Sequence, residues 1–305
     1  MNLKITNNVS EANLVTHDAK FHPDDVFSTV FMSKIVENPV VYRTSVRNVP
    51  KTDAIIYDVG FGKFDHHGAD SKCDENGMKY CSFGLLWEEY GLNYLKSINA
   101  IKPETLFTRI KETLIKQING IDNGIFPTIE APYKLLDLDK IIDLYNNTWD
   151  EKTDNNDNFM KAVKTANDIF ELVIKREQSL LKADELVEQD INNVKDNILI
   201  LRNYMPYSDT IFSSSNPKAK EIKIIITPSN RGGYDIKPIT ISKDSKELLI
   251  RFPSSYNGKQ VDELRKLSGI KTIMFVHANG FLANTGTLED AIELAKQAIN
   301  NPENN

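Results

Sequence analysis

The five histidines of this chain, with the aspartates beside them, are the residues best suited to chemistry. Four of the five fall in two short segments, THDAKFHPDD and YDVGFGKFDHHG. Carboxylates gathered around neutral imidazoles repel one another unless a cation holds them. Mixed aspartate and histidine ligation suits Mn²⁺, Zn²⁺ or Fe²⁺ better than an all-oxygen magnesium site. The two segments therefore predict a centre that binds divalent metal ions.

The apolar runs before these segments predict where the chemistry-bearing residues lie. LVTH ends at His17 and leads to His22 and Asp24, while DAIIYDV carries Asp58 near its end. The carboxyl ends of parallel strands share one edge of a sheet, where ligands collect, so we expect these groups to converge. Asp58 is the candidate for a carboxylate that two ions share. Asp122, in INGIDNGI, is either a further ligand or an ordinary turn residue.

The elements that must position these residues alternate between strands and helices in the first half of the chain. Strand-like runs at 14–17, 39–42 and 53–59 alternate with helical patterns at 24–38, 83–95 and 104–119. This order predicts an α/β fold with a doubly wound parallel sheet. A long helical pattern at 159–190 follows.

The second half of the chain predicts a smaller α+β domain. Its expected strands and helices are 221–227, 235–241, 247–253, 261–269, 272–278 and 288–300. We therefore expect a catalytic domain at 1–195, which includes the long helix as a connector, and a substrate-binding domain at 196–305.

The charge distribution distinguishes the two halves. The whole chain has a net charge of −6, which argues against a nucleic-acid partner. From Lys218 to Lys271, however, twelve Lys or Arg face six Asp or Glu, a net charge of +6, so the remainder carries −12. A solvated face is one explanation, and a phosphate-binding domain is the other.

Composition places the chain among globular proteins. It has 305 residues, 40% of them hydrophobic, with no basic segment followed by an apolar signal core and no run long enough to span a bilayer. We expect a soluble, cytoplasmic protein that has no contact with membranes. Cys73 and Cys81 have neither CxxC spacing nor the number needed for a disulfide framework, and we assign them no role.

Four phrases in order carry a resemblance to known proteins: THDAKFHPDD, YDVGFGKFDHHG, GIDNGI and FVHANGF. Their order resembles the metal motifs of the DHH phosphoesterase superfamily, which includes family II inorganic pyrophosphatases and the single-strand exonuclease RecJ. In detail they resemble the Myg (melanocyte proliferating gene) family, formerly called metal-dependent protein hydrolases and related to an exonuclease that acts on RNA. The resemblance covers nearly the whole chain.

The resemblance implies that six residues bind two divalent ions: His17, His22, Asp24, Asp58, His66 and Asp122. It makes Asp58, His66 and His67 the catalytic set, with Asp58 as the bridge and His67 facing the substrate phosphate. His22 stands where an aspartate is usual in the superfamily, a departure that bears on which metal binds. We expect Mn²⁺, with Zn²⁺, Fe²⁺ and Mg²⁺ as alternatives. Asp25 stands where the Myg group tends to have a glutamate, and we place it outside the ligands. Asp65 orients the loop.

The second domain has its own candidates for binding substrate. His277 ends an apolar strand and is followed by Asn279 and Gly280 in a turn whose backbone N–H groups can approach an anion. The resemblance favours this role for His277 over a structural one. Arg231 and Arg251 can grip phosphate with two hydrogen bonds each, or they are surface charges. The aromatic residues offered for base stacking are Tyr234, Phe252 and Tyr256.

Together these features predict a metal-dependent phosphodiesterase. We expect a 3′–5′ exonuclease that acts on RNA or short single-stranded oligonucleotides, with a water activated by two metal ions as nucleophile. A small-molecule phosphatase or pyrophosphatase is one alternative, and a protein that binds nucleotides without catalysis is another. Both a monomer and a homodimer are compatible with the sequence.

Overall fold

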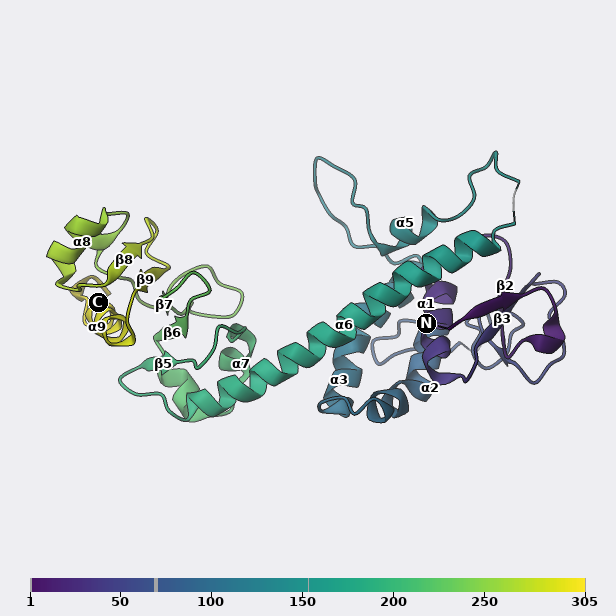
Figure 1. Cartoon of the computed structure of the whole chain (residues 1–305), viewed down its shortest axis with the longest axis horizontal. Helices are drawn as coiled ribbons and strands as arrows, with labels where there is room; N and C mark the ends of the chain where they lie inside the picture. Colours follow the sequence, from purple (N-terminus) through teal and green to yellow (C-terminus); the bar gives the residue numbers. More distant parts are fainter. Residues whose placement is uncertain (1, 69–70, 153, 305) are drawn as a thin grey trace. The chain divides into compact units, whose positions relative to one another are not determined.

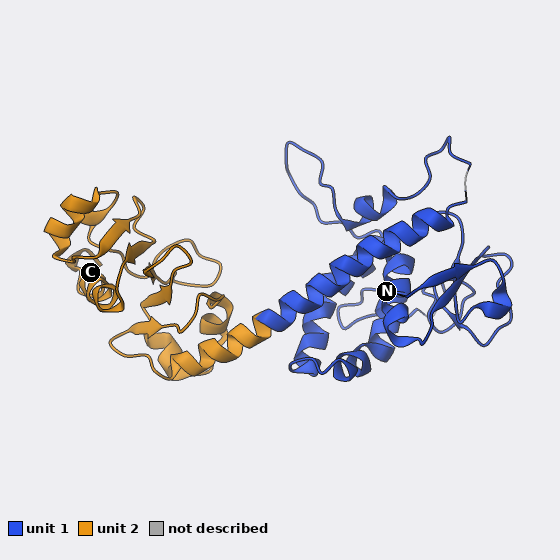
Figure 2. Cartoon of the chain, viewed as in Figure 1, with its two compact units in different colours: residues 1–179 blue, residues 180–305 orange. Residues whose placement is uncertain are grey.

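The computed structural model describes residues 2–68, 71–152 and 154–304, which form two compact units, Met1–Ser179 and Leu180–Asn305 (Figure 2). The first unit is α/β with a parallel sheet, and the smaller second unit combines a mixed sheet with helices. This confirms the predicted fold class.

The sheet of unit 1 has four parallel strands in the order β1-β3-β2-β4. They are β1 Lys4–Thr6, β2 Leu14–His17, β3 Val40–Thr44 and β4 Ile55–Ile56. The helical segments are α1 Pro23–Ile35, α2 Ser82–Ser97, α3 Pro103–Ile110, the π-helical η2 Lys111–Ile115, α4 Lys116–Asp122, α5 Leu138–Asp143 and α6 Asn156–Ile191.

Helix α1 is the centre of this unit. It crosses over between the neighbouring parallel strands β2 and β3, and its residues from Pro23 to Met32 are all buried. Phe31 of α1 packs against Trp87 of α2 and Phe170 of α6, with ring centroids 5.2 and 6.1 Å apart. Figure 1 shows α6 running beside α1 and α3. The N-terminus of α1 is thereby held rigidly at the edge where β2 ends.

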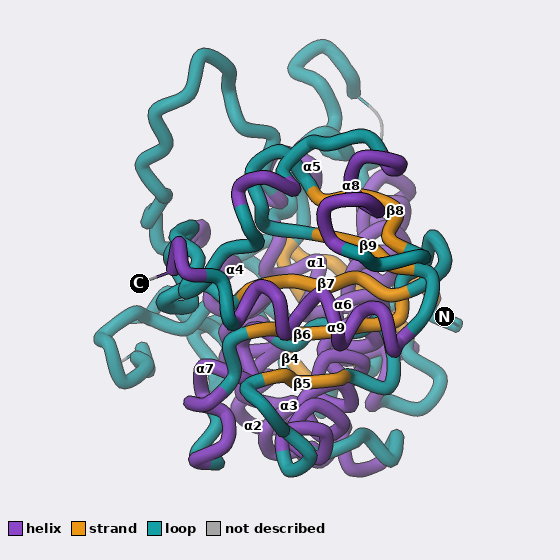
Figure 3. The backbone as a smooth tube through the Cα atoms, turned by 90° about the vertical axis from the view of Figure 1, so that its left-hand side faces the viewer, coloured by secondary structure: helices purple, strands orange, loops and turns teal. Residues whose placement is uncertain are grey.

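Unit 2 contains a five-stranded sheet in the order β5-β6-β7-β9-β8, which Figure 3 shows side by side. Its strands are β5 Ile198–Ile200, β6 Ile224–Pro228, β7 Tyr234–Pro238, β8 Ile273–Val276 and β9 Ala283–Thr285. Its helices are α7 Ser208–Ser213, α8 Val261–Ser268 and α9 Leu288–Ile299. The β5–β6 pair is parallel and the other pairs are antiparallel.

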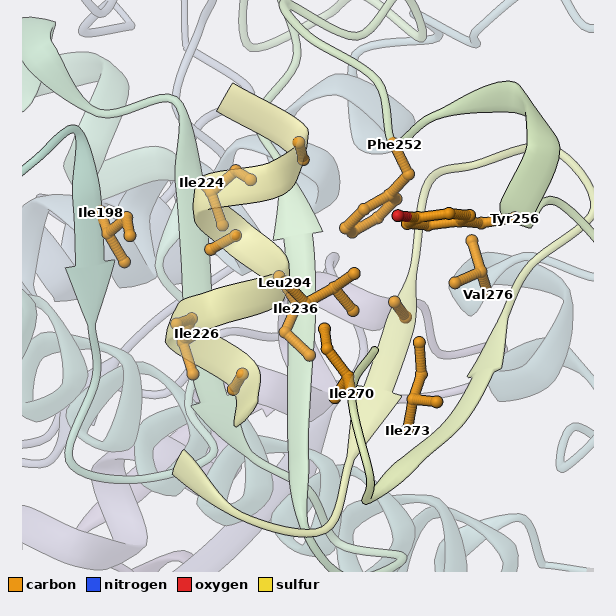
Figure 4. Close-up of a cluster of buried hydrophobic side chains, with 14 of the residues drawn as sticks. Ile198, Ile224, Ile226, Ile236, Phe252, Tyr256, Ile270, Ile273, Val276 and Leu294 are labelled. Carbon is orange, nitrogen blue, oxygen red and sulfur yellow. The ribbon is translucent and has the colours of Figure 1, made fainter. Parts of the chain in front are cut away.

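The core of unit 2 lies between the sheet and α9. Figure 4 shows Leu294 of α9 against Ile224, Ile226 and Ile236 of the strands. The last turns of α6 also belong to this unit, because Val187 packs with the buried residues that follow the helix. The two units therefore divide inside α6, at Ser179, whereas the sequence pattern predicted the whole helix in the first domain.

Two details of the predicted strands differ from the structure. The segment 247–253 forms no strand; only Leu248 makes an isolated bridge, and side chains of Asn301 and Asn304 bind the backbone of Arg251. Ile250 and Phe252 are buried and alternate with exposed residues, which is the pattern that suggested a strand. The strands β1, β5 and β9 were missed because each has only three residues.

None of the helices in the described part of the chain is both long and apolar enough to cross a membrane.

Candidate metal centre

The turn after β2 presents the first group of candidate ligands. His17 ends the strand, and its Nδ1 lies 2.8 Å from the backbone oxygen of Asp18. This contact leaves Nε2 as the ring nitrogen available to a metal ion. Arg43 donates to the backbone oxygens of His17 and Ala19 at 3.2 and 2.8 Å, and its guanidinium lies 4.4 Å from the ring centroid of Phe159. The turn is therefore fixed from two sides.

Asp24 and Asp25 follow in the first turn of α1, where the helix dipole favours carboxylates. Pro23 occupies the first helical position, which needs no hydrogen-bond donor. The exposed fractions of Asp24 and Asp25 are 1% and 0%, so both carboxylates are withdrawn from water. Burial of two adjacent carboxylates is costly unless something of opposite charge meets them.

Asp58 follows β4 in an unusual backbone conformation. Its φ is +56°, in the left-handed region that Asp visits more readily than most residues. Its backbone N–H donates to the oxygen of Phe64 at 3.0 Å, and the hydroxyl of Ser82, at the start of α2, donates to Oδ1 at 3.1 Å. The conformation turns the side chain toward the carboxyl edge of the sheet.

The two carboxylate oxygens of Asp58 face two different histidines. Oδ2 lies 3.2 Å from Nε2 of His17, and Oδ1 lies 3.3 Å from Nε2 of His66. Around the first contact, Asp25 Oδ2 lies 3.5 Å from His17. Around the second, Asp122 Oδ2 lies 3.1 Å and Asp24 Oδ2 lies 3.7 Å from His66. Asp58 is thus the residue shared by both sides.

Asp122 reaches this centre as the last residue of α4. Helix α4 continues α3 through the π-helical turn η2, and such turns are frequent at functional sites. Asn119, 2% exposed, accepts the backbone N–H of Cys81 through Oδ1 at 3.0 Å and so ties α4 to the start of α2. The same short stretch of α2 therefore holds both Asp58, through Ser82, and the helix that ends at Asp122.

Within the described residues, three groups hold ligand atoms within 4.8 Å of one another: His17 with Asp25 and Asp58, Asp24 with His66 and Asp122, and Asp58 with His66 and His67. Four buried oxygens at this centre have no hydrogen-bond donor: both of Asp24, Oδ2 of Asp25 and Oδ2 of Asp122. Buried acceptors without donors are rare in native proteins. Hard oxygen atoms beside imidazole nitrogens fit a divalent cation such as Mn²⁺.

The pKa values reflect this crowding. Burial, with Asp58, Asp122 and Asp25 nearby, raises the pKa of Asp24 well above its ordinary value. Burial likewise raises the pKa of Asp122 to about 6, although His66 opposes it, and that of Asp25 to about 6, against the influence of His17. Buried carboxyl groups with raised pKa values resist ionisation, and a bound cation would offset the charge that they carry once ionised.

The pKa values of two other groups, His17 and Asp58, shift so that the charged form is favoured. Burial alone would lower the pKa of His17, but Asp25 and then Asp58 raise it to about 9. For Asp58, the hydrogen bonds from His17 and His66 outweigh burial and lower the pKa below the usual range. This shift favours the ionised form of Asp58, which is the form of a carboxylate that binds metal ions.

His67 lies at the surface of the centre, with 55% of its side chain exposed. Its Nδ1 is 2.7 Å from Oδ1 of Asp65, which also accepts the backbone N–H of His67 at 3.1 Å. The hydrogen bond to Asp65 raises the pKa of His67, which favours the imidazolium form. Although His67 Nδ1 is also 3.8 Å from Asp58, its tighter partner is Asp65.

The geometry differs from the sequence-based prediction at two residues. None of the three groups in the described residues contains His22, whose ring lies 6.1 Å from that of His17 and lines the same cavity. Asp25, which we placed outside the ligands, lies beside His17 and Asp58. The signal for Asp25 was the adjacent acid pair at the start of a helix whose residues are largely apolar, because a helix buried on all sides up to Met32 buries both acids as well.

An open cavity of about 420 Å³ leads to the centre. Its lining includes His17, His22, Asp58, Asp122 and the segment from Val59 to Phe61, together with the residues 65–67. A volume of this order accommodates a small ligand or one end of a larger one.

The candidates in unit 2 do not all lie together. His277 follows β8; its Nδ1 accepts the N–H of Asn279 at 3.1 Å, and Gly280 has a φ of +67°. Arg251 lies at the same end of the sheet, since its backbone is bound to residues just beyond α9. Arg231 lies in the β6–β7 turn, beside the opposite end of β9.

The structure corrects the prediction that aromatic residues of unit 2 stack on bases. Phe252 and Tyr256 are 1% and 8% exposed and pack in the core, as Figure 4 shows. Tyr234 is partly buried against the same core. The rings of Phe252 and Tyr256, enclosed in this way, have no face free for a base. Cys73 is exposed and Cys81 buried, and both are free thiols.

Comparison with known proteins gives a family and several relatives. The sequence model of the family MYG1_exonuc, described as "Uncharacterised protein family (UPF0160)", matches residues 13–299. The chain is 26% identical to "MYG1 protein" of Dictyostelium discoideum, over 96% of this chain and 98% of that protein. It is 22% identical to "MYG1 exonuclease" of Mus musculus, over 93% and 84%, and 21% identical to the Homo sapiens protein of that name, over 93% and 85%.

One solved structure is also similar, the "pGpG-specific phosphodiesterase" PggH from Vibrio cholerae. It has 16% sequence identity and a TM-score of 0.32, over 93% of this chain and 96% of that one. At this TM-score the likeness supports no statement about fold or activity.

Proposed function

Because this chain belongs to the MYG1_exonuc family, we propose that it is a metal-dependent phosphodiesterase that removes nucleotides from RNA or short single-stranded oligonucleotides, in the 3′–5′ direction. The observation that carries the proposal is the placement of Asp58, whose two oxygens face His17 and His66 within a cluster of buried carboxylates that lack donors. The names of the mouse and human relatives support an exonuclease over other phosphoesterases.

We assign the ligands of two divalent ions, preferably Mn²⁺, from the same geometry. His17, Asp25 and Asp58 hold one, with His22 the nearest further imidazole, and Asp24, Asp58, His66 and Asp122 hold the other. When bound, two such ions would supply Lewis acidity and would lower the pKa of a water molecule from near 16 to about 7. Asp58, whose pKa the hydrogen bonds from His17 and His66 lower despite burial, would be shared by the two ions.

His67 acts on the substrate in this proposal. Asp65 fixes its Nδ1, so Nε2 is the nitrogen free to donate to a phosphoryl oxygen. The raised pKa keeps the ring protonated at higher pH than usual, and a cation beside the phosphoryl group offsets the charge that develops in the transition state. Its exposure is consistent with contact with a ligand that enters through the cavity.

Unit 2 supplies the contacts to the rest of the substrate. Its segment from Lys218 to Lys271 carries the net charge of +6, against a net negative charge elsewhere in the chain. We assign Arg251, His277, Asn279 and Gly280 to phosphate binding at one end of the sheet. Arg231 lies beside the opposite end of β9, so we assign it to a different phosphate of the same substrate.

The experiment is a substrate screen with Mn²⁺-loaded protein. RNA and DNA oligonucleotides labelled at either the 5′ or the 3′ end are compared with a dinucleotide and with pyrophosphate. A 3′–5′ exonuclease shortens 5′-labelled RNA one nucleotide at a time and releases the 3′ label at once. The Asp58→Asn variant, purified in parallel, must be inactive, which excludes a contaminating nuclease.

Other outcomes select the alternatives. Hydrolysis of pyrophosphate without cleavage of any oligonucleotide would show a small-molecule phosphatase. Binding of nucleotides without turnover in Mn²⁺, Zn²⁺, Fe²⁺ or Mg²⁺ would show a protein that binds its ligand without catalysis.

A further inference from the structure

Phe61 is an exposed aromatic residue at the mouth of the metal-centre cavity. Its exposed fraction is 78%, and it lines the same cavity as His66, His67 and Asp122. A single exposed phenylalanine needs no explanation by itself. The position of Phe61 needs one, because a hydrogen bond holds its backbone in place although its side chain is not buried.

The backbone of Phe61 has a φ of +56°, which is uncommon for a bulky residue. One contact fixes it, because its N–H donates to Oδ2 of Asp65 at 2.6 Å. The preceding Gly60 also has a positive φ, of +88°, so two successive residues of this loop have left-handed backbone conformations. Such conformations persist only where surrounding structure imposes them, and they concentrate at functional sites.

Asp65 connects this backbone to the residue assigned to the substrate. One of its oxygens binds the N–H of Phe61 and the other binds Nδ1 of His67. One carboxylate thus sets the positions of an aromatic ring and of a phosphate-binding imidazole at the same opening. Val46, 68% exposed, lines this opening as well and adds a second apolar surface.

We propose that Phe61 is the stacking surface for the nucleobase adjacent to the phosphate bound at the metal centre. The inference rests on the proposed function and names the chemical class of its substrate: a nucleotide with an unpaired base. Every base has a π-face, so stacking on an aromatic ring binds single-stranded nucleic acid with little sequence preference. Pyrophosphate and sugar phosphates have no group that would use such a surface.

The test measures binding of two probes that differ only by the base. Calorimetry gives the Kd of Mn²⁺-loaded protein for adenosine 5′-monophosphate and for ribose 5-phosphate. Loss of one stacked base costs about 1 to 3 kcal/mol, so Phe61→Leu should raise the Kd for adenosine 5′-monophosphate about 5- to 150-fold. The Kd for ribose 5-phosphate should stay unchanged, and Phe61→Tyr, which keeps the ring, should bind both probes as the unchanged protein does.

Tyr133→Leu is the matched control. Its side chain is 70% exposed, close to the value for Phe61, but no residue of its segment lines the cavity. This variant should leave both dissociation constants unchanged. Equal losses on both probes in Phe61→Leu would overturn the proposal, because Phe61 would then only hold the loop of His67. An unchanged Kd for adenosine 5′-monophosphate would overturn it as well.

The outcome is separate from that of the proposed function. If the protein cleaves oligonucleotides and Phe61→Leu binds adenosine 5′-monophosphate normally, the stacking proposal alone is wrong. If no oligonucleotide is cleaved, yet the loss of affinity depends on the base and on Phe61, the exonuclease proposal alone is wrong.

Discussion

Replacing Asp24 with asparagine should stabilise the metal-free protein, although the change removes a buried acidic side chain. Asp24 is 1% exposed, neither of its oxygens has a hydrogen-bond donor, and burial together with Asp58, Asp122 and Asp25 raises its pKa well above the ordinary value. Without metal, the folded protein must either protonate this carboxyl or tolerate an uncompensated charge. A neutral amide of the same shape avoids both.

The magnitude follows from the interval between the ordinary pKa and the working pH. One pH unit corresponds to about 1.4 kcal/mol, and an unfolded aspartate has a pKa of about 3.9, so a carboxyl kept protonated at pH 7 destabilises the fold by up to about 4 kcal/mol. The buried amide that replaces the Asp24 carboxyl would lack partners too, at a cost of about 1 to 3 kcal/mol. The free energy of unfolding should therefore rise by about 1 to 3 kcal/mol at pH 7.

The stabilisation depends on pH. A group whose pKa is raised in the folded state contributes its stability below its unfolded pKa and loses that stability as the pH rises. The advantage of Asp24→Asn should therefore be absent below about pH 4, where the carboxyl is protonated in both states, and should grow toward pH 7.

The assay is denaturant unfolding of both proteins after removal of metal with EDTA, at pH 4 and pH 7. Asp65→Asn is the matched control, because Asp65 accepts three hydrogen bonds, from Phe61 N and from Nδ1 and N of His67. The amide can satisfy only part of this set, so that variant should lose about 1 to 3 kcal/mol. Addition of Mn²⁺ should stabilise the unchanged protein more than Asp24→Asn, which keeps the ligands of the other ion.

Two results would refute this reasoning. If metal-free Asp24→Asn is less stable than the unchanged protein at pH 7, Asp24 makes favourable contacts that the cluster of unpaired carboxylates does not allow. If Mn²⁺ stabilises Asp24→Asn fully, Asp24 is no ligand.

Three further predictions concern the same centre and unit 2. His67→Ala should retain its metal but lose about 100-fold in rate, the scale of one lost electrostatic stabiliser, and loss of metal instead would make His67 a ligand. Replacing Arg231 and Arg251 together should raise the KM for long oligonucleotides more than that for a dinucleotide and weaken its salt dependence, because a dinucleotide has fewer phosphates to hold; equal losses on both substrates would contradict the assignment of the two arginines to different phosphates. Because the pKa values of Asp25 and Asp122 are about 6 without metal, protons compete with the ion, so the rise in Tm caused by Mn²⁺ should be larger at pH 7.5 than at pH 5; an equal rise at both would show that these two are not ligands.

Much of the centre was predictable because its residues follow strand ends. A strand that ends in His17, another that leads to Asp58, and the histidine pair after Asp65 could be brought together by the rule that parallel strands share a carboxyl edge. The structure does bring His17, Asp58 and His66 together.

The role of Asp25 depended on burial, which one sequence shows only indirectly. The pattern HPDD indicates a helix start, but only the packing of α1 on all sides forces both acids into the interior. Likewise, nothing in the letters YDVGFGKF indicates that Asp65 holds Phe61 in a left-handed conformation at the cavity mouth. Contacts between residues that are four apart in an irregular loop follow from dihedral angles, and those have no periodic signature.

The buried aromatics of unit 2 show the opposite error. Phe252 and Tyr256 stand in a basic segment, which suggested a nucleic-acid surface, yet both side chains fill the core beneath α9. Charge composition describes a surface as a whole and does not assign individual rings to it. The segment 247–253 was mistaken for a strand because Ile250 and Phe252 are buried at alternate positions, although only Leu248 forms an isolated bridge.

The sharing of Asp58 by two ions can be measured by electron paramagnetic resonance of the Mn²⁺-loaded protein together with its metal content. We expect two Mn²⁺ ions per chain with the spectrum of an exchange-coupled pair. In Asp58→Asn, metal content should fall and the coupling should disappear while the protein stays folded. A single ion per chain, two ions without coupling, or a coupled pair that survives in Asp58→Asn would show that Asp58 does not bridge two ions.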